Sequence, residues 1–417
     1  MSLQRLAILS VHTSPLAPMG GKKTGGMNVY ILELARELGR RGISVDIFTR
    51  RSDPAEPNVD TRIGDNVRVI YLAAGGVSPL APDDIFPHLP EFTARLIAFA
   101  TTEGRGYDLV YSHYWLSGWV AQKLKEAWGT RFVQMFHTLG EMKQRIAGAE
   151  RHFLPDQRIQ TEQDIAQWAD ALIAATPAEH AQLMWLYRAK RRKIHVVPPG
   201  VDIERFTPLP KSFARGALGY AERNILLFVG RIEPLKALDT VLEALANLKI
   251  NNPNLLAQTR LLVVGGNLRG DDPEMIRLQA MVATLGLEAN VSFVGAKSQQ
   301  DLPCYYAAAS ALLMPSDYES FGMVALEAMA SGTPVVASAV GGLAFLVEDG
   351  ETGFHVPIRE PKVLSARIEA LLEDDTLRDH MGRKAAHVAR DYAWGKIAER
   401  LLVIFNDVRA SGVKTLV

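Results

Sequence analysis

The hydrophobic positions of this chain form short continuous runs, separated by stretches with helical spacing. In the first half the runs cover residues 6–11, 43–49, 67–72, 109–112, 132–137, 171–175 and 194–197. Between the first two runs, Met27, Ile31, Leu34 and Leu38 recur on one helix face, and Gly42 follows as a helix stop. Continuous apolar runs are typical of strands buried on both faces, and their alternation with helices predicts parallel strands joined by helical crossovers.

The same pattern repeats after a proline-rich segment that divides the chain. Pro-Pro-Gly at 198–200 and the following VDIERFTPLP are the best linker candidate, and a second series of runs covers 225–229, 261–264, 291–294, 311–314 and 334–337. A chain of 417 residues also exceeds the roughly 250–300 at which one core stops growing. We therefore predict an α/β protein of two doubly wound domains, residues 1–205 and 206–393. We expect them to face each other across a cleft and to bind ligands beyond the carboxyl ends of the strands.

Composition and charge narrow the class of protein. Hydrophobic residues make up 48% and charged residues 22%, as in ordinary globular proteins. The 46 basic and 46 acidic residues cancel, so the basic excess of a nucleic-acid-binding protein is missing. We interpret the basic run RAKRRK at 188–193 as a solvated helix end or turn, with an anion or membrane-surface contact as the alternative. A single cysteine, Cys304, excludes an internal disulfide and a cysteine-based zinc site.

Neither a membrane span nor a signal peptide is expected. No stretch approaches the roughly 18 apolar residues that cross a bilayer. The opening sequence MSLQRLAILSVHTSP is interpreted as a first strand rather than a signal peptide. The expected compartment is the cytoplasm.

The segment PSDYESFGMVALEAMA at 315–330 carries the strongest signal for ligand binding. A helix is expected to begin near Phe321 and Gly322, where glycine lets a ligand approach the backbone and free N–H groups favour a phosphate. Glu327 lies among apolar neighbours and is suited to accept two hydrogen bonds from a ribose diol. In the alternative interpretation, Glu319 only stabilises the helix start and Glu327 is a surface residue.

A second candidate is VGRIEPLK at 229–236. A strand is expected to end at Gly230, so Arg231 and Lys236 follow at its carboxyl end, where two cations suit a diphosphate. In the alternative interpretation both are surface residues, with Glu233 as their partner.

Two segments of the first half are weaker candidates. The loop GGKKTGGMN at 20–28 is rich in glycine, but Leu16 and Lys23 break the phosphate-loop pattern. No strand–helix turn carries G-x-G-x-x-G either, which argues against an ATPase and a dinucleotide-dependent dehydrogenase. His137, at the end of the run 132–137, is placed for active-site work, and a satisfied buried histidine is the alternative.

Six motifs together resemble the family-4 retaining glycosyltransferases of the GT-B fold. They are GGMNVY at 25–30, SHYWLSG at 112–118, HTLG at 137–140, VPPGVD at 197–202, VGRIEPLK at 229–236 and the Glu319-x7-Glu327 pair. The resemblance covers nearly the whole chain and implies that the helix 394–417 packs back on the first domain. The N-terminal motifs are most similar to inositol-phosphate N-acetylglucosaminyltransferases, with sucrose-phosphate synthases as near relatives. Transfer of glucose or N-acetylglucosamine from a nucleotide-sugar, expected to be UDP-linked, to a phosphorylated sugar or polyol is thereby implied.

The resemblance also assigns roles on the nucleotide-sugar side. It implies that Arg231 and Lys236 bind the diphosphate, that Glu327 holds the ribose, and that His137 hydrogen-bonds the sugar near the reacting centre. Catalytic roles fall to His137, Arg231, Lys236 and Glu319. Further contacts to the nucleotide-sugar are implied for Gly25, Gly26, Gly230, Gly265, Lys297 (where the base is read), Glu319 and the backbone of Phe321, Gly322, Met323 and Val324.

On the acceptor side, the resemblance points to residues that grip a phosphate. Tyr114, Thr138 and Arg158 match such contacts, and Asn28 joins them. Where the inositol-phosphate enzymes carry a lysine, this chain has Pro82, so we hypothesise that Lys143 or Lys22 supplies the missing charge.

The expected mechanism needs neither a metal nor another cofactor. The chain has no Asp-x-Asp motif, and Arg231, Lys236 and a helix start offer positive charge instead. No carboxylate of the first domain is an obvious nucleophile, so a front-face retaining route is expected, driven by leaving-group stabilisation and orientation. Two rivals stay open: a nucleotide-sugar epimerase of the same architecture, and a non-catalytic sugar-nucleotide-binding protein. The complete set Arg231, Lys236, Glu319 and Glu327 weighs against the second rival.

Overall fold

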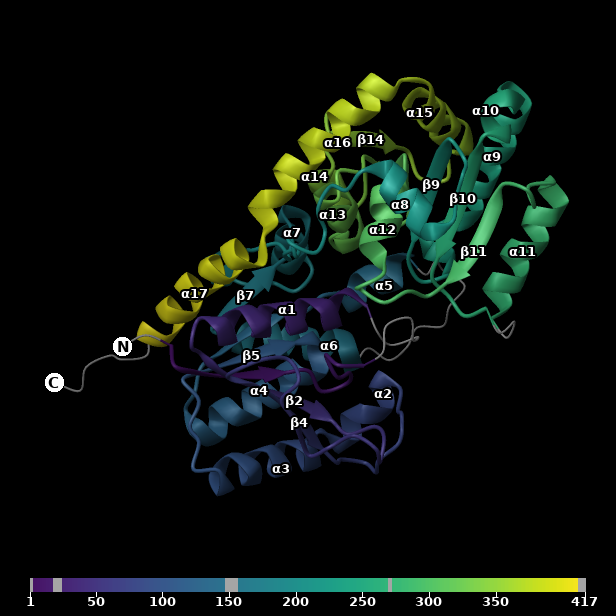
Figure 1. Cartoon of the computed structure of the whole chain (residues 1–417). Coiled ribbons are helices and arrows are strands. Elements are labelled where there is room, and N and C mark those ends of the chain that lie inside the picture. The colour runs from purple at the N-terminus through teal and green to yellow at the C-terminus, as the bar shows by residue number, and fades with distance from the viewer. Residues whose placement is uncertain (1–2, 18–24, 147–156, 269–271, 412–417) are drawn as a thin grey trace. The chain divides into compact units, whose positions relative to one another are not determined.

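The computed structural model describes residues 3–17, 25–146, 157–268 and 272–411 (Figure 1). The chain forms two compact units. The N-terminal unit comprises Met1–Ala17, Gly25–Pro198 and Trp394–Val417, and the C-terminal unit contains Pro199–Ala393. The chain leaves the N-terminal unit at Pro198, within the proline-rich segment, and returns to it at Trp394. In the described part of the chain, no helix has both the length and the apolar character needed to cross a membrane.

The N-terminal unit is built on a sheet whose strand order is β3-β4-β2-β1-β5-β6-β7-β8. All its neighbouring strands are parallel except β3 and β4. The strands are β1 (Arg5–Leu9), β2 (Ser44–Arg50), β3 (Val59–Asp60), β4 (Val67–Leu72), β5 (Leu109–His113), β6 (Phe132–Met135), β7 (Ala171–Ala174) and β8 (Ile194–Val196). The α-helices are α1 (Gly26–Arg40), α2 (Pro82–Ile85), α3 (Leu89–Thr102), α4 (Tyr114–Trp128), α5 (Gly140–Ile146), α6 (Gln157–Trp168), α7 (Pro177–Trp185) and α17 (Trp394–Ala410).

The apolar runs of the first half all coincide with strands of this sheet. The strand that they do not predict is β3, which has only two residues and pairs antiparallel with β4. On α1, Ile31, Leu34 and Leu38 are fully buried, and Gly42 ends the turn after the helix with a φ of +80°. The basic run 188–193 forms a turn and a short 3-10 helix, Arg191–Lys193, with Arg188, Lys190, Arg191 and Arg192 exposed.

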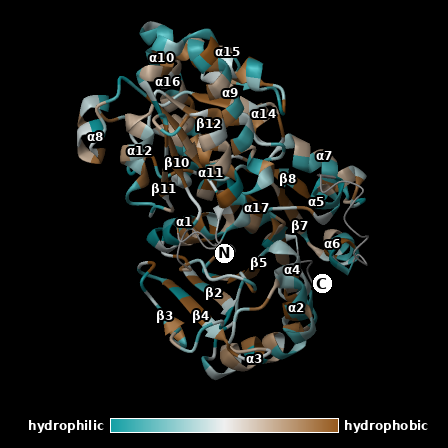
Figure 2. Ribbon diagram, turned by 90° about the vertical axis from the view of Figure 1, so that its right-hand side faces the viewer, coloured by the Kyte–Doolittle hydropathy of each residue, from teal (hydrophilic) through white to brown (hydrophobic). Residues whose placement is uncertain are grey.

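The C-terminal unit has an all-parallel sheet in the order β11-β10-β9-β12-β13-β14. Its strands are β9 (Asn224–Val229), β10 (Thr259–Val264), β11 (Val291–Gly295), β12 (Ala311–Met314), β13 (Val335–Ser338) and β14 (Gly353–Val356). Its α-helices are α8 (Lys211–Leu218), α9 (Leu238–Asn251), α10 (Pro253–Ala257), α11 (Pro273–Leu285), α12 (Leu302–Ala308), α13 (Met323–Ala330), α14 (Leu343–Leu346), α15 (Pro361–Glu373) and α16 (Asp375–Ala389). The strand β14 was not predicted, because Gly353 and His355 interrupt its apolar residues. Figure 2 shows hydrophobic residues concentrated on the strands around β10 and β12.

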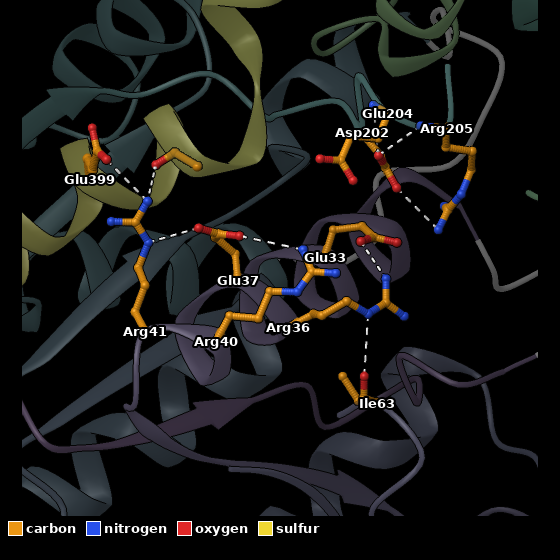
Figure 3. A network of polar contacts seen from close by, with 11 residues as sticks. Glu33, Arg36, Glu37, Arg40, Arg41, Ile63, Asp202, Glu204, Arg205 and Glu399 are labelled. Carbon is orange, nitrogen blue, oxygen red and sulfur yellow. Dashed lines mark hydrogen bonds and ion pairs between the residues drawn. The ribbon is translucent and has the colours of Figure 1, made fainter. Parts of the chain in front are cut away.

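The last helix, α17, completes the N-terminal unit. The ring of Trp394 packs edge-on against Tyr30, and the ring of Phe405 packs against Tyr111. At the surface, Arg41 donates to the Gly395 carbonyl oxygen at 3.0 Å and to Glu399 Oε1 at 3.2 Å, while its Nε pairs with Glu37 (Figure 3). The helix therefore belongs to the core of a unit whose other residues lie some two hundred positions earlier or more.

Candidate active site

Both sheets reverse their strand order at one point, and the candidate residues follow the strands that flank it. In the C-terminal unit the reversal lies between β9 and β12, and in the N-terminal unit it lies between β1 and β5. Parallel strands place their carboxyl ends at one sheet edge, and a reversal opens a crevice there between diverging loops. VGRIEPLK begins with the last residue of β9, PSDYESFG follows β12, and Tyr114 follows β5. Each unit therefore presents its candidate residues at such a switch point.

The two loops of the C-terminal switch point are joined to each other. The Asp317 N–H donates to the Leu235 carbonyl oxygen at 2.9 Å. Lys236 Nζ donates to Glu319 Oε2 at 2.6 Å. The structure thus brings together two residues that lie 83 positions apart in the sequence.

The helix that follows β12 begins with Gly322 as its N-cap. Gly322 has a φ of +103°, and a Cβ there would lie 2.6 Å from Leu343 Cδ2, so both backbone conformation and space require glycine. Met323 and Val324 form the first turn of α13, where N–H groups lack intrahelical partners. The expected helix start is therefore present in this unit, with a glycine N-cap.

Two further glycines support this helix start and were missed in the sequence. The Gly342 N–H donates to the Glu319 carbonyl oxygen at 3.1 Å. A Cβ at Gly342 would lie 2.2 Å from Phe321 Cα, and one at Gly341 would lie 1.8 Å from the Glu319 oxygen. The segment from Glu319 to Phe321 therefore packs directly against the backbone of Gly341 and Gly342. In the sequence, this Gly-Gly pair after the predicted strand 334–337 was the signal that could have indicated the contact.

Glu327 is buried and held by two side chains. The Tyr306 hydroxyl donates to its Oε2 at 2.7 Å, and Gln299 Nε2 donates to its Oε1 at 3.1 Å. With 4% of its surface exposed, Glu327 is not the surface residue of the alternative interpretation. Its carboxylate is fixed in orientation at the second turn of α13.

Arg231 has the partner that the alternative interpretation named. Its Nη1 pairs with Glu233 Oε1 at 2.7 Å, and both side chains are exposed. Lys236 and Arg231 are therefore each matched with a carboxylate, and a diphosphate arriving here would compete with Glu319 and Glu233 for them.

Gly230 and Gly265 make a close backbone contact at the ends of β9 and β10. The Gly230 N–H donates to the Val264 carbonyl oxygen at 3.0 Å, and a Cβ at Gly265 would lie 1.8 Å from the Gly230 oxygen. Gly265 itself has a φ of +141°. Lys297 lies beyond β11, with Nζ 5.9 Å from the centre of the Tyr305 ring.

In the N-terminal unit, two histidines meet at the ends of β5 and β6. His113 Nδ1 lies 2.9 Å from His137 Nε2, and His137 has a left-handed φ of +61°. Burial, together with nearby His12, lowers the pKa of His137 to about 3. Burial and His137 also hold the pKa of His113 well below its usual range. Both imidazoles are therefore neutral at pH 7, and each can accept or donate a hydrogen bond.

Arg158, whose partner Thr138 directly follows His137, forms hydrogen bonds with residues of three segments. Its Nη1 donates to the Tyr114 hydroxyl at 3.1 Å, its Nη2 to Thr138 Oγ1 at 3.1 Å and to the Thr138 carbonyl at 2.9 Å, and its Nε to Glu162 at 2.7 Å. Burial alone would lower the pKa of Arg158, but Glu162 together with Tyr114 and Tyr187 more than offsets this effect and the pKa is raised. We call Arg158, Tyr114, Thr138 and Glu162 the Arg158 cluster. It joins three of the residues that the sequence assigned to acceptor binding.

Glu162 and Tyr187, which sequence reasoning missed, hold this cluster in place. Glu162 is fully buried, and its Oε2 accepts from the Gly140 N–H at 2.9 Å and from the Tyr187 hydroxyl at 2.7 Å. The Tyr187 hydroxyl in turn accepts from the Glu141 N–H at 3.0 Å. The loop HTLG at 137–140 is therefore tied to the same carboxylate that orients Arg158.

The remaining candidates lie in different surroundings. Asn28 is buried; its Oδ1 accepts from the Gly25 N–H, and its Nδ2 donates to Thr13 Oγ1 and the Ser14 carbonyl, so it ties the first turn of α1 to Thr13 and Ser14. Gly25 caps α1 and Gly26 begins it. Lys143 is exposed on α5, whereas Lys22 and most of the loop 20–28 lie outside the described residues. Among the described residues, no group of three or more His, Cys, Asp or Glu side chains is placed to hold a metal ion.

Comparison with known proteins shows the class of this architecture. The model of Glycosyltransferase Family 4 matches residues 24–205, and that of Glycosyl transferases group 1 matches residues 212–388. The solved structure of sucrose-phosphate synthase from Thermosynechococcus elongatus superposes with a TM-score of 0.88 and 34% identity, covering 98% of this chain and 100% of that one. The HepE structure from Anabaena, with a TM-score of 0.75 and 22% identity over 97% of this chain and 100% of that one, shares the fold. The molecule is thus a two-domain α/β glycosyltransferase of the GT-B fold.

Curated relatives that match nearly the whole chain are also glycosyltransferases. The D-inositol 3-phosphate glycosyltransferase of Kineococcus radiotolerans is 42% identical over 416 residues, covering 97% of this chain and 95% of the relative. That of Corynebacterium urealyticum is 38% identical over 408 residues, covering 97% and 96%. The chain belongs to glycosyltransferase family 4. The predicted fold class and the family resemblance are both confirmed.

Proposed function

We propose that this enzyme is a retaining hexosyltransferase that moves glucose or N-acetylglucosamine from a UDP-sugar to a phosphorylated sugar or polyol. The observation that carries the proposal is the Arg158 cluster, a largely buried guanidinium hydrogen-bonded to two hydroxyls, those of Tyr114 and Thr138, at 3.1 Å each. Arginine presents a planar fork of N–H groups that matches a phosphate. Two relatives are named for a phosphorylated compound: one is a D-inositol 3-phosphate glycosyltransferase and the other a sucrose-phosphate synthase.

The choice of acceptor depends on what surrounds this cluster. Pro82, which stands where the inositol-phosphate enzymes carry a lysine, is the first residue of α2. Asp83 follows it and lies close enough to Tyr114 to contribute, after burial, to the raised pKa of that phenol. The site thus has an acid where a cation was expected. Both fructose 6-phosphate and an inositol phosphate stay as candidate acceptors.

On the nucleotide-sugar side, the proposal uses the C-terminal switch point. The diphosphate binds at the start of α13 with Lys236 and Arg231, which leave their carboxylate partners for it. Glu327, already oriented by Tyr306 and Gln299, accepts from the ribose hydroxyls. Glu319, released by Lys236, accepts from the hydroxyls of the hexose. Positive charge for the leaving group comes from these side chains and the helix start, so we propose a metal-independent reaction.

The proposed chemistry is a front-face displacement. The bond from the anomeric carbon to the diphosphate oxygen breaks, and a bond to the acceptor hydroxyl oxygen forms on the same face. The acceptor proton passes to the departing diphosphate oxygen, so the products are UDP and the acceptor glycosylated at its hydroxyl, with its phosphate unchanged. Neutral His137 hydrogen-bonds the hexose near this centre without carrying charge. Stabilisation of the leaving diphosphate is the main contribution to the rate.

A matrix of substrates tests the proposal. UDP-glucose and UDP-N-acetylglucosamine are each incubated with fructose 6-phosphate, inositol 3-phosphate and the two unphosphorylated acceptors, and the products are read by mass spectrometry and NMR. We expect transfer only to a phosphorylated acceptor, with the anomeric configuration retained and with activity in EDTA. Equal transfer to unphosphorylated acceptors would refute the role of Arg158. An epimerised UDP-sugar without transfer would favour the epimerase alternative.

A further inference from the structure

Arg359 joins three segments of the C-terminal unit. It lies between β14 and α15 and has a left-handed φ of +57°, which is uncommon for a residue other than glycine. Its Nε and Nη2 donate to the two carboxylate oxygens of Asp317 at 2.8 and 2.5 Å. Its Nη1 donates to Asp239 Oδ1 at 2.8 Å, and Nη2 also donates to the Pro234 carbonyl oxygen at 2.9 Å.

Two of these segments carry Lys236 and Glu319. Pro234 lies two residues before Lys236, and Asp317 lies two residues before Glu319. Asp239 is in the first turn of α9, directly after the lysine loop. One guanidinium therefore spans both switch-point loops, alongside the backbone hydrogen bond from Asp317 to Leu235.

The contacts of Arg359 are better suited to positioning the two loops than to stabilising the folded unit. The Arg359 side chain is 41% exposed, and exposed ion pairs contribute only about 0–1 kcal/mol to stability. A bidentate arginine–carboxylate pair nevertheless fixes direction, which a lysine ammonium cannot do. Asp317 draws the pKa of Arg359 upward, so the charge is permanent.

We propose that Arg359 is a positioning residue for the diphosphate of the nucleotide-sugar. It holds the loop of Lys236 and the loop of Glu319 in register, so that the ammonium and the start of α13 act on the same phosphate. Arg359 itself does not contact the phosphate in this proposal. The proposal rests on the proposed function, because it presumes that these loops bind a nucleoside diphosphate.

The test compares the affinities of UDP and UMP, measured by calorimetry on the full chain. The variants are Arg359→Ala, Arg359→Lys and Asp317→Asn, with Arg277→Ala as the matched control. Arg277 also pairs with Asp239, at 3.2 Å, but its contacts are with α9 and α11 rather than with the two loops. Melting curves establish that each variant is folded.

We expect both Arg359 variants and Asp317→Asn to weaken UDP binding by about 10-fold or more, the loss of a charge-assisted contact, with UMP affinity changed less than about 3-fold. Arg277→Ala should leave the ratio of the two affinities as in the wild type. An unchanged ratio in folded Arg359→Ala would overturn the proposal, as would equal losses for UDP and UMP. If Arg359→Ala does not fold, Asp317→Asn decides in the same way. A wild-type protein that does not prefer UDP to UMP would instead contradict the proposed function.

Discussion

The two units differ in how their candidate cations are held, most clearly in the burial and number of contacts of the carboxylate partner. In the N-terminal unit, Arg158 is 16% exposed and its partner Glu162 is fully buried. In the C-terminal unit, Arg231 and Glu233 are 50% and 38% exposed, and Lys236 and Glu319 are 20% and 17% exposed. Glu162 also accepts from Gly140 and Tyr187, whereas the C-terminal pairs are short contacts between flexible side chains at loop positions.

This difference separates a preformed site from one that must rearrange. A buried ion pair is costly to break, because the remaining charge is left without solvent or partner. A solvent-accessible pair exchanges its partner for a ligand at little cost. We therefore expect the Arg158 cluster to be set before any ligand arrives, and the C-terminal cations to change partners if a diphosphate binds as proposed.

The largest expected effect comes from breaking the C-terminal pair. Lys236→Ala removes the ammonium that stabilises the leaving group, and we expect turnover at saturating nucleotide-sugar to fall about 10²–10³-fold. The melting temperature should change by no more than about 4 °C, because both side chains keep some exposure, 20% and 17%, and solvent can reach the Glu319 carboxylate that is left. Lys362→Ala, an exposed lysine on α15, is the control. Wild-type turnover in Lys236→Ala would remove the leaving-group role.

The next effect tests the buried cluster. Arg158→Ala should raise the KM of the phosphorylated acceptor and also cost about 3 kcal/mol of stability, because Glu162 is left charged and buried. The double variant Arg158→Ala/Glu162→Gln should recover part of the stability but none of the acceptor affinity. UDP affinity should stay at the wild-type value in both. Recovery of acceptor affinity in the double variant would show that Arg158 acts only in folding.

The smallest effect uses pH to locate buried charge in the N-terminal unit. Glu179 lies in the first turn of α7 with its Oε2 accepting from the Ala175 N–H, and burial raises its pKa to about 7. The folded state then keeps a proton that the unfolded chain loses near pH 4.5, so this group lowers stability as pH rises from about 4.5 to 7. The buried histidines act in the opposite sense, lowering stability as pH falls below about 6.5.

Glu179→Gln isolates the carboxyl contribution from that of the histidines. The difference in unfolding free energy, variant minus wild type, should rise by on the order of 2 kcal/mol between pH 5 and pH 8. All six tryptophans of the chain belong to the N-terminal unit, so urea unfolding followed by tryptophan fluorescence reports that unit alone. A difference that is flat across this range would mean that Glu179 is ionised in the folded state.

Local pattern predicted most of the fold. Continuous apolar runs correspond to β1, β2 and β4 to β13, because buried parallel strands need such runs. The strands β3 and β14 escaped because the first has two residues and the second is interrupted by Gly353 and His355. Their existence depends on pairing with a neighbouring strand rather than on their own sequence.

The candidate site was less predictable, since its contacts join distant segments. The Lys236–Glu319 pair follows from two loops at one switch point, which the pattern of strands indicated. Arg158, Tyr114 and Thr138 came from family resemblance, and nothing in their spacing shows that they meet. The sequence places Glu162 one helical turn beyond Arg158, but it does not show that Glu162 is buried. Arg359 was missed because it follows the unpredicted β14.

The return of the chain at Trp394 has a consequence for biosynthesis. Residues 199–393 of the C-terminal unit are made as one stretch, before the last segment of the N-terminal unit, which begins at Trp394. The aromatic faces of Tyr30 and Tyr111 stay uncovered until Trp394 and Phe405 have been made. The N-terminal unit is therefore translated first but completed last. A nascent chain stalled before codon 394 would expose the rings of Tyr30 and Tyr111 to chaperones.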